Sequence, residues 1–249
     1  MNRIALALIT FLLFSDYCFS QVINIESKRF HNDSSRWVGK IDGNFSAVKN
    51  IQEVITFGLN IHTQYQKGKS RVLAIGDLAF IKAGNTDFMN SGYQHLRYNY
   101  KLNKWLTWEA FIQAQYNRVL LLDRRYLAGT GPRFKLVKRE HLRIYTAALY
   151  MYEYQAQNND SLERYSNRLS AYLSFNISFG KFEFTSTTFY QPNFADFNDY
   201  RIANNSMLEL ILTKHLNLKS ELVLLYDTRQ PLRVPDLVYT IRSGISYKF

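Results

Sequence analysis

Cysteine, proline and glycine are scarce in this chain of 249 residues, which has 1 Cys, 4 Pro and 11 Gly. The single cysteine is Cys18, within an N-terminal segment that we expect to be cleaved. A mature chain without cysteine has no disulfide, no thiol chemistry and no thiolate metal site. The few Pro and Gly residues form no linker, so the sequence predicts one domain.

Long hydrophobic runs are also missing, apart from one near the N-terminus. Met1–Arg3 supplies positive charge, and Ile4–Phe14 is apolar but too short to span a bilayer as a helix. Small residues precede Gln21, so we expect a signal peptide over residues 1–20 and an irregular segment over residues 21–36. The alternative, a lipid-attached Cys18, is disfavoured because Asp16 and Tyr17 precede it. Beyond this segment apolar and polar residues are interleaved, which excludes a helical membrane protein.

The last thirteen or so residues alternate strictly between an apolar and a polar face. One face carries Leu237, Tyr239, Ile241, Ser243, Ile245, Tyr247 and Phe249, and the other carries Thr240, Arg242, Gly244, Ser246 and Lys248. A strand of a soluble sandwich can show the same alternation. Together with a secretion signal, a final amphipathic strand that ends on Phe is typical of a bacterial outer-membrane β-barrel. We expect the barrel assembly machinery to recognise Phe249 as a membrane-insertion signal.

Twelve segments have strand character, which is an even number, as single-chain bacterial barrels require. Aromatic residues make up 16% of the chain, which fits the aromatic girdles of such barrels. The sequence therefore predicts an all-β, antiparallel, up-and-down transmembrane barrel over residues 37–249. The expected strands are Trp37–Phe45, Val54–Tyr65, Arg71–Lys82, Gly92–Tyr100, Trp105–Tyr116, Arg124–Leu136, Leu142–Tyr154, Asn167–Phe179, Phe182–Gln191, Ile202–Thr213, Leu216–Tyr226 and Asp236–Phe249.

The connections between these segments alternate in length after the first hairpin. The short ones are Gln66–Ser70, Lys101–Lys104, Val137–Glu140, Gly180-Lys181 and Lys214-His215. The long ones are Ala83–Ser91, Asn117–Asp123, Gln155–Ser166, Pro192–Arg201 and Asp227–Pro235. Short periplasmic turns and longer outer loops distinguish outer-membrane barrels. We expect both chain ends on the periplasmic side.

The alternation also assigns an inward face to each strand. Leu169, Ala171, Leu173, Phe175, Ile177 and Phe179 form the lipid face of their strand, because a charge facing lipid at the midplane costs about 2–4 kcal/mol. The interior charges then form either a salt-bridged plug or the lining of a narrow selective pore. They are Arg97, Glu109, Arg133, Arg143, Glu153, Arg168, Glu183, Glu209, Glu221 and Arg242, together with Lys40, Asp42 and Lys219.

Four motifs in the C-terminal quarter carry a family resemblance. They are Tyr190-Gln-Pro-x-Phe-x-Asp-Phe-x-Asp-Tyr-Arg201, Leu212-Thr-x-x-Leu-x-Leu218, Tyr226-Asp-x-Arg-x-Pro-x-x-Val-x-Asp236 and Gly244-x-Ser-Tyr-x-Phe249. This region resembles the uncharacterised family called domain of unknown function 481, some members of which are labelled salt-induced outer-membrane protein. The resemblance implies an outer-membrane barrel and no established activity. Ala83–Asp87 is the displaced counterpart of a Ser-Gly-Asn-Thr hairpin that the family leads us to expect.

A cluster of charged residues lies in two adjacent long loops. Arg–carboxylate bonds between these loops would clamp them. Two alternatives are a divalent cation site at Asp196, Asp199, Asp227 and Asp236, and contact of Arg201, Arg229 and Arg233 with lipopolysaccharide. The cluster comprises Asp196, Asp199, Arg201, Asp227, Arg229 and Asp236.

No arrangement of residues predicts catalysis. The histidines His31, His62, His95, His141 and His215 are scattered, and no Ser, His and Asp converge in one strand. The net charge of +11 comes without a basic run or a stacking motif, which disfavours nucleic acid and leaves the phosphate-rich outer leaflet as counter-charge. We expect a non-enzymatic outer-membrane protein that acts as a narrow channel or envelope scaffold, with lipid and lipopolysaccharide as partners and without cofactor or metal. The alternatives are a membrane-embedded enzyme that acts on lipid and a soluble periplasmic binding barrel.

Overall fold

The protein forms one antiparallel sheet in which twelve strands follow one another in sequence order. The structure is a computed structural model that describes residues 36–49, 53–157, 163–213, 216–230 and 234–247. The predicted twelve-stranded, antiparallel, up-and-down order is confirmed. No helix in the described residues is long and apolar enough to cross a membrane. The strands are β1 (Arg36–Lys49), β2 (Glu53–Lys67), β3 (Ser70–Ala83), β4 (Thr86–Lys101), β5 (Leu106–Asn117), β6 (Leu122–Lys138), β7 (Leu142–Gln157), β8 (Glu163–Phe179), β9 (Phe182–Pro192), β10 (Tyr200–Ile211), β11 (Leu216–Asp227) and β12 (Leu237–Tyr247).

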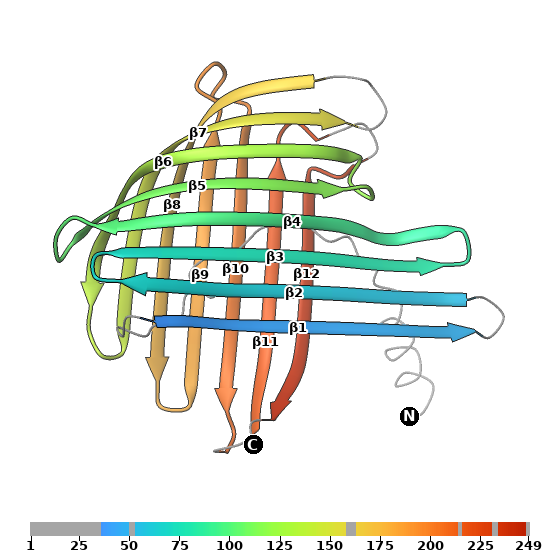
Figure 1. The fold of residues 1–249 in the computed structure, drawn as a ribbon, viewed down its shortest axis with the longest axis horizontal. Helices are drawn as coiled ribbons and strands as arrows, with labels where there is room; N and C mark the ends of the chain where they lie inside the picture. Colours follow the sequence, from blue (N-terminus) through green and yellow to red (C-terminus); the bar gives the residue numbers. More distant parts are fainter. Residues whose placement is uncertain (1–35, 50–52, 158–162, 214–215, 231–233, 248–249) are drawn as a thin grey trace, which may run out of the picture.

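The sheet curls back over itself and encloses an interior. Figure 1 shows β2–β5 running across the front, while β9–β12 run behind them at a steep angle. The order of strands begins with β1 and ends with β12, so these two are the edges of the sheet over the described residues. The enclosed space between the front and back strands holds the side chains that determine what the protein can do.

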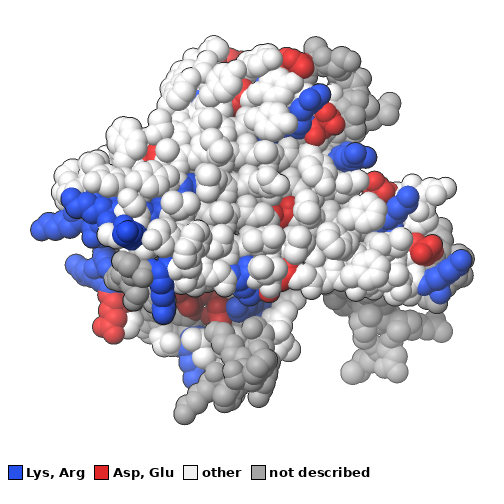
Figure 2. Space-filling model, viewed as in Figure 1, with Lys and Arg blue, Asp and Glu red and all other residues white. Residues whose placement is uncertain are grey.

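Side chains alternate between the enclosed space and the outer surface, as the sequence predicts for β8. Arg168, Ser170 and Ser174 are buried, whereas Leu173 and Ile177 on the same strand are exposed. The outer surface is apolar because each strand turns its hydrophobic residues outward. Figure 2 shows that this surface is largely free of charge across the strands and that Lys and Arg gather at one end.

An apolar layer also lies inside the sheet. Phe111, Leu149, Met151, Tyr172 and Phe189 belong to one buried cluster. A smaller cluster consists of Leu73, Ile75 and Tyr93. These clusters explain why the segments that became β3 and β7 are apolar on both faces: their inward residues pack against other side chains and do not face water.

The predicted alternation of loop lengths is wrong in the first half of the chain. Residues 83–91 were expected to be a long loop, but Ala83 ends β3, a tight turn follows at 84–85, and β4 begins at Thr86 and pairs with β3. Gly84 has a φ of 57° in this turn, a left-handed conformation that glycine adopts without steric cost. The connection at 118–121 is short for the same reason, because β5 and β6 extend further than the hydrophobic pattern indicates. In the second half the connections 193–199 and 228–236 are longer than 180–181 and 212–215.

Two glycines in β6 mark a close approach between strands. A Cβ on Gly131 would lie 2.7 Å from the Cα of Leu149, and one on Gly129 would lie 2.5 Å from the Phe111 ring. Any larger residue would push β6 away from its neighbours. The structure thus places these glycines at a tight point of the curled sheet, as expected for residues that permit a bend.

Candidate functional site

Six charged side chains meet inside the sheet near the outer loops, and we call them the outer cluster. Glu153 lies at its centre. The Nε of Arg168 donates to Glu153 at 2.7 Å, Nη1 of Arg201 donates at 2.5 Å, and Nε of Arg125 lies 3.0 Å from the same carboxylate. The cluster consists of Arg125, Glu153, Arg168, Asp199, Arg201 and Asp227.

The two aspartates of the outer cluster complete a balanced set of three positive and three negative charges. Arg168 donates to Asp199 Oδ1 at 2.7 Å, and Arg201 donates to Asp227 Oδ2 at 2.5 Å. Arg168 also donates to the backbone carbonyls of Gln191 and Asp199 at 3.0 and 3.1 Å. Its side chain is 0% exposed, so its charge is stabilised entirely by these protein groups. An ion network of this kind is stable only when nearly all its donors and acceptors are paired.

The strand register brings the outer cluster together from five separate strands and one loop. Arg201 in β10 lies directly opposite Asp227 in β11. Arg125 in β6 lies opposite Gln155 in β7, and Gln155 accepts hydrogen bonds from Arg125. Glu153 is two residues from Gln155, so its side chain points to the same side of the sheet. The curl of the sheet then brings Glu153 to Arg201, which lies 48 positions away in the sequence.

A second charged group, the inner cluster, surrounds Glu109 on β5. Arg97 donates to Glu109 at 2.6 Å, Asn99 donates at 2.5 Å, and the Tyr172 hydroxyl donates at 3.0 Å. Arg133 lies 3.6 Å from the same carboxylate. Glu109 is 0% exposed. The inner cluster is Arg97, Asn99, Glu109, Arg133 and Tyr172, and it joins β4, β5 and β6 to β8 across the interior.

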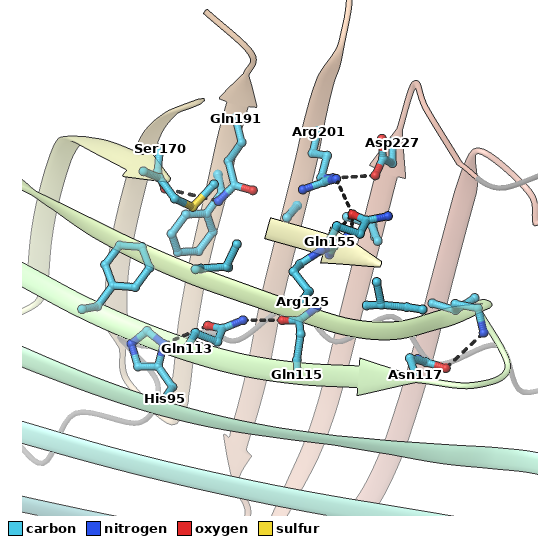
Figure 3. A pocket seen from close by; sticks show the side chains of 18 of the residues that line it. His95, Gln113, Gln115, Asn117, Arg125, Gln155, Ser170, Gln191, Arg201 and Asp227 are labelled. Carbon is cyan, nitrogen blue, oxygen red and sulfur yellow. Dashed lines mark hydrogen bonds and ion pairs between the residues drawn. The ribbon is translucent and has the colours of Figure 1, made fainter. Parts of the chain in front are cut away.

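A cavity of about 100 Å³ lies between these groups, as Figure 3 shows. Arg125, Arg201 and Asp227 line one side, and His95 and Gln113 line the other. His95 Nδ1 lies 2.8 Å from Gln113 Oε1, so the opposite wall is also hydrogen-bonded. A space of this size holds a few water molecules. Its polar wall can bind water or one small polar group.

The predicted interior charges divide into three groups by burial. Arg97, Glu109, Arg133, Glu153 and Arg168 are buried. Arg143, Glu209 and Glu221 are half-buried. Glu183 and Arg242 are exposed, as are Lys40 and Asp42.

Position in the sheet explains which charges remain exposed. Glu183 is the second residue of β9, next to the turn at 180–181, and Arg242 lies on the edge strand β12. Lys40 and Asp42 lie on the other edge strand, β1, and pair with each other at 2.6 Å. A strand at an edge lacks one neighbour, so its inward side chains are less covered. Lys219 lies 3.5 Å from Glu209, and Arg242 lies 3.7 Å from Glu221.

The residues predicted to form one loop cluster lie in separate groups. Asp199, Arg201 and Asp227 belong to the buried outer cluster, whereas Asp196 and Arg229 form a more exposed pair at 3.1 Å. The backbone N–H of Asn198 and the Arg229 guanidinium lower the pKa of Asp196 below its ordinary value. The side chain of Asp236 is exposed, and its backbone carbonyl accepts from the Asp227 N–H at 2.9 Å.

Several residues predicted from the sequence either form other contacts than those expected or lie outside the described residues. No group of three or more His, Cys, Asp or Glu residues suited to a metal occurs in the described part of the chain. The aspartates proposed for a cation, Asp196, Asp199 and Asp227, instead face arginines. Arg233, Phe249 and the signal segment 1–20 lie outside the described residues.

Arg125 is the main functional residue that the sequence analysis missed. It lies an even number of positions before Arg133 on β6, so strand alternation was sufficient to assign it to the interior. Gln155 and Asn99 were also missed, because neutral amides do not stand out in a search for charges. Their roles depend on contacts across strands that the sequence does not show.

The fold and its interior define an antiparallel, up-and-down β-protein with an apolar outer surface and a paired, charged interior. The chain belongs to the family described as protein of unknown function, DUF481, which matches residues 52–249. The resemblance inferred from the C-terminal motifs is thereby confirmed, and β1 lies outside the matched region. No curated protein matches the chain.

Solved porins show a distant likeness to this chain. The NanC porin is 13% identical, with a TM-score of 0.48, and the match covers 86% of this chain and 98% of that one. The KdgM porin is 11% identical, with a TM-score of 0.41 and coverage of 80% and 96%. The KdgM porin in complex with disordered oligogalacturonate is 12% identical, with a TM-score of 0.42 and coverage of 83% and 98%. These scores are too low to transfer any property to this chain.

Proposed function

We propose that this protein is a bacterial outer-membrane β-barrel whose interior is blocked, with a structural or passive role in the envelope. The observation that carries the proposal is the contrast between the two faces of the sheet. Charges such as Arg168 and Glu109 are 0% exposed inside, while large apolar residues are exposed outside.

The outer face supports a lipid environment. Phe179 is 80% exposed, Phe45 is 73% exposed and Ile241 is 64% exposed, and they lie on strands distributed around the sheet. An apolar surface this extensive is unfavourable in water and marks contact with a protein partner or a membrane. Because the exposed apolar residues recur on nearly every strand, a lipid surround is the partner that satisfies all of them at once.

The interior supports a barrel whose lumen is blocked better than an open pore. The outer cluster, the apolar layer and the inner cluster fill successive levels of the enclosed space. The charges of the outer cluster balance one another, so little net field remains to attract an ion. A hydrated selective pore instead exposes its charges to the passing solute.

Insertion into a membrane also requires the edges of the sheet to be satisfied. Unpaired backbone N–H and C=O groups do not occur in contact with lipid. We therefore propose that β1 and β12 pair with each other in the membrane, which closes the barrel. We assign the protein no catalytic role.

Membrane fractionation combined with a gel assay tests the barrel. The full-length protein, expressed with its signal segment in a Gram-negative host, should be recovered in the outer-membrane fraction. A folded barrel should migrate differently in gels before and after boiling. Recovery in the soluble periplasmic fraction, with identical migration in both gels, would contradict the proposal and favour a soluble binding barrel.

A further inference from the structure

A second cavity, of about 240 Å³, opens at the end of the sheet opposite the outer loops. We call it the basic vestibule. The β2–β3 turn contributes Lys69, the β4–β5 turn contributes Lys104, and β6 and β7 contribute Lys138 and Arg143. Figure 2 shows the resulting concentration of Lys and Arg at the left end of the molecule, where Figure 1 places the β2–β3 and β4–β5 turns.

The charge of the basic vestibule is one-sided. Eight of the described residues that line it are Lys or Arg, and none of them is Asp or Glu. Lys69, Lys101, Lys104 and Lys138 form no ion pair with any other described residue. Like charges held this close repel one another, so a bound anion would stabilise the site.

Two carboxylates close to the vestibule offset little of its charge. Glu109 lies 3.6 Å from Arg133 and is also bound by Arg97 and Asn99, so it is shared among several donors. Glu140 lies in the adjacent β6–β7 turn, is 89% exposed and is 3.9 Å from His141. The positive charge of the vestibule is therefore not balanced by the groups that surround it.

The floor of the vestibule is held in place by packing. Arg133 is 8% exposed, and its guanidinium lies 3.8 Å from the centre of the Tyr145 ring. Arg71 donates twice to Gln66 Oε1, at 2.9 and 2.6 Å. These contacts hold the two guanidinium groups at fixed positions, and a planar guanidinium matches the geometry of phosphate oxygens.

We propose that the basic vestibule binds a ligand with two or more adjacent phosphate groups. The volume exceeds what a single phosphate fills, and eight cations exceed the charge that one phosphate neutralises. Closely spaced phosphates match the several cationic side chains that converge from two turns and from β3, β4, β6 and β7. Asn99 and Arg133 of the inner cluster form part of the vestibule wall. If the barrel lies in the outer membrane as proposed, the vestibule opens to the periplasm, but binding itself does not depend on that placement.

Calorimetric titration of the folded, full-length mature protein in neutral detergent with inorganic tripolyphosphate tests the proposal. We expect saturable binding to one site that weakens as salt is added. The double variant Lys104→Gln/Lys138→Gln should lower affinity at least about tenfold, because each exposed lysine removed takes away a phosphate contact. The matched control Arg118→Gln/Arg164→Gln removes the same charge from the opposite end and should change affinity less than about twofold.

Three results would overturn the proposal. One is the absence of saturable binding, and another is an equal loss of affinity in both double variants, which would indicate only attraction to net charge. The third is equal affinity for citrate, which would replace phosphate with carboxylate as the ligand group. Heat-dependent gel migration of both variants confirms that they fold. Displacement of tripolyphosphate by micelles that contain cardiolipin, whose headgroup carries two phosphates, would identify a lipid headgroup as the source of the phosphates, and lack of displacement would identify a soluble ligand.

Discussion

Replacement of Arg168 by methionine tests the paired interior most sharply. The substitution keeps a long side chain, but it removes the ion pairs to Glu153 and Asp199, both at 2.7 Å. It also removes the donors to the carbonyls of Gln191 and Asp199. The outer cluster would be left with two arginines and three carboxylates, of which Glu153 is only 1% exposed. Removal of one partner from a buried ion pair costs about 3–5 kcal/mol of stability.

The cost should be recovered in part when the partner is removed as well. Glu153→Met alone leaves an excess positive charge, whereas Arg168→Met/Glu153→Met restores the balance with two charges of each sign. We expect a coupling free energy of about 1–3 kcal/mol between the two positions. Arg242→Met is the matched control, because Arg242 is 57% exposed and 3.7 Å from Glu221. An exposed pair of this kind contributes about 0–1 kcal/mol.

The assay is a urea titration of each variant, folded into liposomes, with recovery of the unboiled gel band as the measure of folding. Arg168→Met should shift the midpoint far more than Arg242→Met does. The reasoning is refuted if the two variants lose the same stability, or if Arg168→Met and Glu153→Met are simply additive.

Four further predictions concern the surface, the loops and the chain ends. Leu173→Arg should destabilise the protein in liposomes by about 2–4 kcal/mol, and Phe179→Arg, near the end of β8, by about 0–1 kcal/mol; equal costs would contradict the assigned depth in lipid. The pKa of Asp196 is lowered, so its pair with Arg229 stabilises the outer loops above the unfolded pKa of about 3.9. This stabilisation is lost as pH falls through the folded pKa. Protease cleavage of these loops should therefore rise at low pH in the wild type and vary less with pH in Asp196→Asn. Deletion of Phe249 should sharply reduce insertion in cells, and normal amounts of surface-accessible protein would refute its role as an insertion signal. The mature protein lacks cysteine, so a cysteine at Ile41 or Phe45 on β1 can be paired with one introduced at Tyr239 or Ile241 on β12. At least one such pair should cross-link in liposomes, whereas failure of every pair would argue against closure by these strands.

The strands and the direction of their side chains could be predicted because the alternation of apolar and polar residues is a local property of the sequence. Leu173 and Arg168 belong to opposite faces of β8 whatever the neighbouring strands do. The connection at residues 83–91 was mispredicted for the opposite reason. Its polar residues pair along β3 by backbone hydrogen bonds, and those bonds do not depend on the side-chain pattern.

The contents of the interior could be predicted, but their partners could not. Glu153 and Arg168 were assigned to the interior from alternation alone. Their contacts with Arg201 and Asp199 depend on the curl of the sheet, which joins residues 48 and 31 positions apart. Burial also depends on location within the sheet, so Arg242 on an edge strand stays exposed although its phase is the same. The basic vestibule was missed because its lysines come from separate strands and short turns and form no run in the sequence.

Conductance of the purified, refolded protein in a planar lipid bilayer tests the central claim most directly. The paired clusters and the apolar layer predict little or no steady current, apart from rare and very small steps. Arg168→Met should not create a selective channel, although transient openings should accompany its lower stability. Large, stable, porin-like conductance of the wild-type protein would contradict the blocked interior on which this account depends.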